Sequence, residues 1–215
     1  DSLNTDDAIG FLATVNQLNL ALLTQGTTKY TGLEIQGLGA SLVGLGDDFV
    51  LEAANVNVLI NQVSVVNGTK LNWGSLSSVA ADDPLVFSSA LTANVELQAS
   101  GDVALNIYGF VMAVGSFDIF KGSVSATAAE AGVELVNAQL LSIELSNIEV
   151  FVGVGGAFED TQGTTTKTDD SLNTDDAIGF LATVNQLNLA LLTQGTTKYT
   201  GLEIQGLGAS LVGLG

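Results

Sequence analysis

The sequence predicts an all-β fold, and three observations support this prediction. Apolar and polar residues alternate with period two through almost every segment, which is typical of strands with one face buried. Val, Ile, Leu and Thr dominate, and Pro84 is the only proline, so little interrupts strand pairing. Residues 1–46 also return unchanged as residues 170–215, and repetition at a long period is typical of arrays whose units pack on their neighbours.

The repeat defines the expected domain organisation. Residues 1–169 form one full period, and residues 170–215 are the beginning of the next, identical period. We therefore expect the chain to be part of a longer repetitive protein, in which each period packs against the next.

A weaker pattern divides the period into about four degenerate sub-repeats. The apolar alternation changes parity near Asn16, Asn55 and Asn147, and a related stretch has Gly101 at the corresponding place without such a change. Together with Asn185, these positions recur at intervals of 38 to 46 residues. A parity change requires a bulge or a corner, because successive side chains of a regular strand point to opposite faces.

Each sub-repeat is expected to hold two long strands with a second corner at a glycine. The candidates are Gly37, Gly74, Gly115 and Gly155. Asn and Gly suit such corners, since they tolerate left-handed backbone conformation best.

Two architectures agree with these patterns. In the first, long strands stack in parallel register as the coils of a wide β-solenoid. In the second, antiparallel hairpins form one β-sandwich per period, and the acidic stretch of residues 159–176 joins the sandwiches like beads. The recurrence of corner residues at similar spacing favours the solenoid, whereas the short turns fit hairpins equally well.

The charge balance limits the possible partners. The chain has 23 acidic residues against five basic ones, all lysine, and a net charge of −18. Nucleic acids and anionic membranes would be repelled, because both are bound through Lys and Arg. No apolar run reaches the ~18 residues of a membrane span. We expect divalent cations and neighbouring or identical copies of the chain as partners, without membrane insertion.

The composition also predicts that the protein is not an enzyme. The chain lacks His and Cys, so the common nucleophile and base pairs are missing. Paired carboxylates remain as an acid–base alternative, either Glu144 with Glu149 or Asp47 with Asp48. Polar strand positions and turn residues explain these four residues more simply.

The acidic connection between periods is a candidate calcium site. Ca²⁺ binds six to eight oxygens from carboxylates, amide carbonyls and the backbone. The proposed ligands are Asp160, Asp169, Asp170, Asn173, Asp175 and Asp176. The corresponding residues of the preceding copy are Asp1, Asn4, Asp6 and Asp7, and weaker candidates are the Asp47/Asp48 and Asp82/Asp83 pairs.

Three stretches carry a resemblance to a known class of proteins: LEAANVNVLINQVS (residues 51–64), IEVFVGVGGAF (148–158) and TDDSLNTDDAIGF (168–180). They resemble the long tandem repeats of giant bacterial secreted and surface proteins, the adhesin-like chains associated with RTX segments. The resemblance implies export, an extracellular or cell-surface location, and extension stabilised by calcium. The chain lacks the glycine-rich nonapeptide of true RTX rolls.

We therefore expect a structural repeat of a giant extracellular fibre, filament or surface matrix, which provides extension and mechanical stability and self-associates. The alternative function is an adhesin extender or binding module that recognises a glycan or another cell surface. Glycan binding would require exposed aromatic residues, and the chain offers only Trp73, Tyr30, Tyr108 and Tyr199 as candidates.

Overall fold

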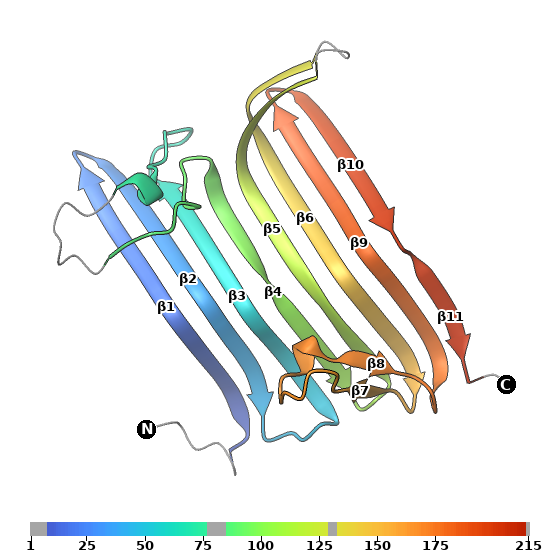
Figure 1. Ribbon diagram of the computed structural model, residues 1–215. Helices are drawn as coiled ribbons and strands as arrows, with labels where there is room; N and C mark the ends of the chain where they lie inside the picture. The colour runs from blue at the N-terminus through green and yellow to red at the C-terminus, as the bar shows by residue number, and fades with distance from the viewer. Residues whose placement is uncertain (1–7, 77–84, 129–132, 214–215) are drawn as a thin grey trace.

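The computed structural model describes residues 8–76, 85–128 and 133–213, and most of them belong to one open β-sheet (Figure 1). The nine strands of the sheet lie in the order β1-β2-β3-β4-β5-β6-β9-β10, and β11 pairs with β9 beyond the end of β10. The strands are β1 (Gly10–Gln25), β2 (Thr28–Val43), β3 (Phe49–Val63), β4 (Val95–Ile107), β5 (Val111–Ala128), β6 (Val133–Val154), β9 (Ile178–Gln194), β10 (Thr197–Gln205) and β11 (Gly208–Val212). The remaining elements are the two-stranded sheet of β7 (Ala157–Glu159) and β8 (Ser171–Asn173) and the 3-10 helices η1 (Trp73–Ser75) and η3 (Lys167–Asp169).

The all-β prediction is confirmed, and every strand pair in the described sheets is antiparallel. The parallel register that we expected of stacked coils is therefore wrong. Short turns such as the one between Gln25 and Thr28 reverse the chain directly, and Gly26 supplies the left-handed conformation of that turn (φ 61°). Among the described helices, none is both long and apolar enough to cross a membrane.

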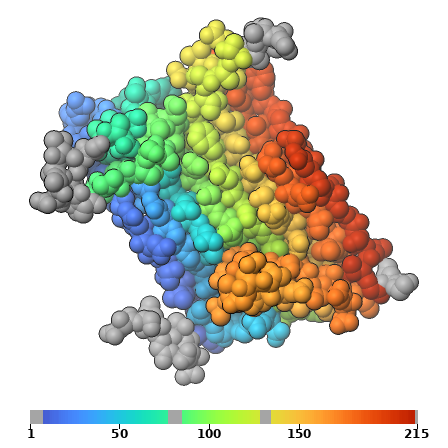
Figure 2. Space-filling view, viewed as in Figure 1, coloured from blue at the N-terminus to red at the C-terminus, as the bar shows by residue number. Residues whose placement is uncertain are grey.

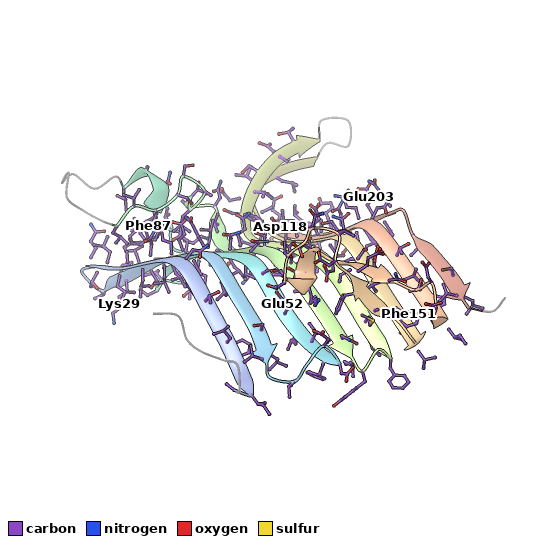
Figure 3. The ribbon with its side chains drawn as sticks, turned by 60° about the horizontal axis from the view of Figure 1, so that its bottom comes forward. Lys29, Glu52, Phe87, Asp118, Phe151 and Glu203 are labelled. Carbon is purple, nitrogen blue, oxygen red and sulfur yellow. The ribbon has the colours of Figure 1, made fainter. Side chains whose placement is uncertain are left out.

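A line of Asn and Gly residues crosses the sheet, and we call it the crease. Its members, in strand order, are Asn16, Gly37, Asn55, Gly101, Gly115, Asn147, Asn185 and Gly206. The pairing register shifts between Ala54 and Asn57 on β3 and between Val114 and Ser116 on β5, which is the bulge geometry that a parity change requires. The strands bend part-way along their length (Figure 3).

Backbone conformation explains why these residue types occupy the crease. Asn55 and Asn147 are left-handed, with φ of 53° and 51°. Gly37 is also left-handed (φ 61°) and lies against Asn16, so that an added Cβ would be 2.2 Å from the amide nitrogen of Asn16. Of the four expected glycine corners, Gly37 and Gly115 lie in the crease, Gly74 lies in η1 and Gly155 follows β6.

Two covering segments pack on one side of the sheet, which we call the front face (Figure 2). The first covering segment is residues 64–76 and 85–94, and its apolar core consists of Trp73, Phe87, Leu91 and the adjoining Val95. The second covering segment is residues 155–177, and Ala177 packs there with Met112 and Phe151 of the sheet. The weaker calcium candidates Asp82 and Asp83, Pro84 and the candidate ligands Asp1, Asn4, Asp6 and Asp7 lie outside the described residues.

The opposite side of the sheet, the back face, is apolar on both halves of the strands. Residues on this face that are more than 40% exposed include Phe11, Val15, Leu18, Leu20, Leu51, Val103, Val152, Phe180, Leu202 and Leu211. Strand alternation assigns them to this side, because their neighbours along the chain, such as Asn19 and Glu52, contact the covering segments on the front. The parity changes at the crease thus keep apolar residues on one face along the whole length of a strand.

Candidate functional site

The junction between the two periods is an uninterrupted part of the sheet. Strand β9, which repeats the sequence of β1, pairs with β6 from Gln139↔Thr193 to Val154↔Ile178. The second copy also repeats the hairpin of the first, since Thr197 pairs with Gln194 just as Thr28 pairs with Gln25. The first residues of a new period therefore add a hairpin to the edge of the preceding period.

A row of polar side chains follows the front face through this junction. Glu144 on β6 accepts a hydrogen bond from the Gln186 amide at 2.9 Å, and Asn188 donates to Glu203 at 3.3 Å. Gln205 donates to the other oxygen of Glu203 at 2.8 Å. The row continues from one period into the next, so side-chain bonds reinforce the backbone ladder across the junction.

The first copy contains the same polar row beneath a cover. Glu34 corresponds to Glu203 and is only 2% exposed. Its carboxylate accepts hydrogen bonds from Gln36 at 2.9 Å, from Asn19 at 3.5 Å and from the backbone N–H of Ser88 at 3.0 Å. Burial raises the pKa of Glu34, but these bonds outweigh burial and leave the pKa below its ordinary value.

Asn61 fixes the same covering segment from β3. Its side-chain amide is fully buried and donates to the carbonyls of Leu71 (2.7 Å) and Thr92 (2.9 Å). It accepts a bond from the indole N–H of Trp73 at 3.1 Å. The first covering segment is thus held to the sheet by buried polar groups as well as by its apolar core.

The carboxylate pairs suggested by the sequence have different partners in the structure. Glu149 accepts a hydrogen bond from the backbone N–H of Leu172 at 2.9 Å and so holds the second covering segment, whereas Glu144 contacts Gln186. The strand register instead places Glu144 directly opposite Asp118 on β5. Burial, and then the charge of Glu144, raise the pKa of Asp118. Sequence spacing missed this pair, because only the pairing of β5 with β6 brings the two residues together.

The predicted calcium ligands form turns rather than one cluster. Asp160 accepts backbone N–H bonds from Gln162, Gly163 and Thr164, of which the first is 3.0 Å long. The Thr164 hydroxyl donates to Asp169 at 3.0 Å. Among the described residues, no three acidic side chains lie close enough to share a metal ion.

The remaining predicted ligands include one unusual residue, Asp170. The Asn173 side chain accepts the N–H of Asp175 at 3.0 Å, and Asp176 is exposed. Asp170 is 7% exposed, and neither of its carboxylate oxygens has a hydrogen-bond partner. Burial raises the pKa of Asp170, although the Lys167 amine, 3.7 Å from the carboxylate, acts in the opposite direction.

Comparison of the chain with protein-family models, with curated proteins and with solved structures found no match.

Proposed function

We propose that this chain is a structural repeat of a giant extracellular or cell-surface fibre, in which successive periods extend a single β-sheet. The observation that carries the proposal is the β6–β9 pairing, where an identical copy of β1 joins the sheet of the preceding period while the connecting residues 155–177 pack on the front face. Antiparallel strands lie side by side along the fibre, as a continuous solenoid-like stack. The work of such a protein is to span distance and resist unfolding.

The free edges of the sheet support this proposal. In the first copy, β2 pairs with β3, whereas the same sequence in β10 and β11 lies at the edge of the sheet. The continuation of the second period would supply a copy of β3 for that edge. Likewise, the outer edge of β1 has the sequence that β9 uses to pair with β6. Each period therefore carries the two complementary edges that an extended array requires.

Charge supports an assembly that responds to divalent cations. The five lysines leave most of the 23 carboxylates unbalanced, and such self-repulsion keeps separate fibres apart until cations screen or bridge it. Within the second covering segment, Asp170 is the residue where a bound Ca²⁺ would have most effect, because its buried carboxylate accepts no hydrogen bond and has only the Lys167 amine, 3.7 Å away, to balance its charge.

The experiment is electron microscopy of recombinant chains with two, four and six periods, with calcium and with chelator. The proposal predicts smooth rods whose length increases in proportion to the number of periods. Compact beads separated by thin linkers would overturn it. Loss of order only in chelator would assign a role to calcium, and indifference to chelator would remove calcium from the proposal.

A further inference from the structure

We propose that the back face of the sheet is the docking surface for the back face of a second copy of this chain, so that two sheets pack face to face. The proposal goes beyond the array described above, because array growth uses strand edges whereas this contact uses a face. The two associations are therefore separable by experiment.

The back face exposes large apolar side chains from one edge of the sheet to the other. Phe11 and Leu22 at one end of the sheet are 65% and 75% exposed, and Leu202 and Leu211 at the other end are 63% and 68% exposed. Leu51 on β3 is 48% exposed, so the exposure is not confined to edge strands. Hydrophobic residues of this size, left in water over a whole sheet, lose the burial that normally stabilises a β-layer.

The back face also has the area that a stable interface needs. A strand of about 15 residues is ~50 Å long, and neighbouring strands are ~4.8 Å apart, so this sheet presents roughly 2,000 Å² on each face. A stable interface needs about 800 Å² from each partner. Contiguous apolar patches on monomers seldom exceed a few hundred Å². The back face is therefore large enough for a stable dimer.

Charge is distributed unequally between the two faces of the sheet. The strand carboxylates of Glu34, Glu52, Asp118, Glu144 and Glu203 all belong to the front-face row or contact a covering segment. Figure 3 shows Glu52, Asp118 and Glu203 on this side. The exception is Glu96 at the start of β4, which pairs with Lys121, so most of two back faces can meet without opposing carboxylates, which would be costly to bury.

The crease keeps the apolar residues of each strand on the back face. Without a parity change at Asn55 and Asn147, one half of each of these strands would direct its apolar residues to the front face. The left-handed conformation of both residues is unfavourable for L-amino acids. The sequence maintains this conformation on β3 and β6, and the result is one apolar face across both halves of the sheet.

The repeat identifies the second copy as the occupant. The back face continues across the period junction through Val152 and Phe180, which are directly paired. Another copy has the same spacing of apolar residues and the same face width, so it matches along its whole length, and a two-fold arrangement makes the contact self-complementary. A lipid surface fits less well, because membrane-bound faces have Lys, Arg and Trp at their borders and this chain has five lysines and one tryptophan.

The test is the mass of the 215-residue chain in solution, measured by light scattering. We expect twice the chain mass of 22.0 kDa for the unchanged protein. The double variant Val15→Glu with Leu211→Glu should be monomeric, because both residues lie on the back face. The matched control is Thr14→Glu with Ser210→Glu, which adds the same charges to the same two strands at exposed positions of the front face. This control should remain a dimer.

Three results would overturn the proposal. A monomeric unchanged protein would exclude the dimer, and its flotation with phosphatidylcholine vesicles would identify lipid as the occupant. Equal loss of mass in both variants would mean that the copies associate through strand edges.

Dye fluorescence at single introduced cysteines tests the same contact without the charged variants, which could lose mass because they fail to fold. The chain has no cysteine, so Leu51→Cys and Ser210→Cys each provide one site for an environment-sensitive dye. Emission from the Leu51 site should shift to the red on dilution, when dimers dissociate, while emission from the Ser210 site stays constant. The proposal would be contradicted if the dye at position 51 emitted at the wavelength of a fully hydrated dye at every protein concentration.

Discussion

The buried carboxylate of Glu34 gives a prediction with an internal control. Substitution Glu34→Gln replaces one carboxylate oxygen by an amide group and removes the charge. The backbone N–H of Ser88 and the amide of Gln36 donate to different oxygens of this carboxylate, at 3.0 and 2.9 Å. In the variant one of these donors faces the new N–H₂ group and loses its acceptor, and the other keeps only a neutral, weaker acceptor. Hydrogen bonds to charged groups contribute about 1.5–3 kcal/mol each. We expect the variant to lose about 2 kcal/mol in the free energy of docking the first covering segment.

The control is the same substitution at the same place in the second copy, Glu203→Gln. Glu203 has the identical neighbouring sequence and retains the bonds from Asn188 and Gln205, but it is exposed and has no covering segment. Exposed substitutions usually change stability by less than about 0.5 kcal/mol. The difference between the two variants therefore isolates the contribution of the cover.

Trp73 fluorescence in urea is the appropriate assay. Trp73 is the only tryptophan, is 5% exposed and lies in the first covering segment, with its ring centroid 5.5 Å from that of Phe87. The pKa of Glu34 lies below its ordinary 4.5 in the folded protein, so its contribution is present above pH 4.5 and is lost as the pH falls through the folded value. The gap between the unchanged protein and Glu34→Gln should thus close in acid. Equal effects of the two Gln variants at neutral pH would refute the reasoning.

Substitutions at Gly32, Asn55 and Asp170 test the packing of the cover, the crease and the buried carboxylate in turn. Gly32→Ala should displace Trp73, because the added Cβ would be 2.7 Å from the indole ring, and should lower the free energy of unfolding by about 1–3 kcal/mol, measured by Trp fluorescence in urea. Gly201→Ala, at the copy of this position, has 4.0 Å of clearance and should be neutral or stabilising. Similar losses of stability in both variants would contradict the packing of Trp73 on Gly32. Asn55→Ala should lower the free energy of unfolding in urea by about 1–2 kcal/mol, because residue 55 has a left-handed backbone that alanine adopts poorly, whereas Asn55→Gly should not. An alanine variant as stable as the unchanged protein would show that the backbone of residue 55 is not constrained. Asp170→Asn should stabilise the second covering segment by about 1–2 kcal/mol at pH 7 in chelator, measured by hydrogen exchange. Because burial raises the pKa of Asp170, this gain should vanish below the ordinary value of 3.8, and a loss at pH 7 would contradict the account.

The sequence predicted the strand content and the crease well, because both depend on local chemistry. Alternation with period two gives strands directly, and the parity changes at Asn55 and Asn147 coincide with left-handed residues and shifted registers. At Gly101 the sequence kept its parity, and the bulge lies on the neighbouring strand β3. At Asn16 the parity changes although the β1–β2 register does not shift, so a parity count alone does not identify the strand that carries an extra residue.

Strand direction and the polar contacts could not be predicted in the same way. A two-residue turn and a solenoid corner both use Gly and Asn, so composition could not separate antiparallel from parallel pairing. The bond between Glu34 and Ser88 and the opposition of Asp118 and Glu144 join residues that lie far apart in the chain. Such contacts depend on the register of neighbouring strands, which a single sequence does not contain.

The central claim is that successive periods continue one sheet, and the axial advance per period tests it most directly. Five strands, β2 to β6, lie between β1 and its copy β9, so the copy is six inter-strand steps away. At ~4.8 Å per strand the advance should be about 29 Å, measured by cryo-electron microscopy of chains with four or six periods. An advance near 29 Å with unbroken strand density across every junction would support the account. An advance of roughly 40 Å or more with gaps between compact units, or about 19 Å as for four stacked coils, would contradict it.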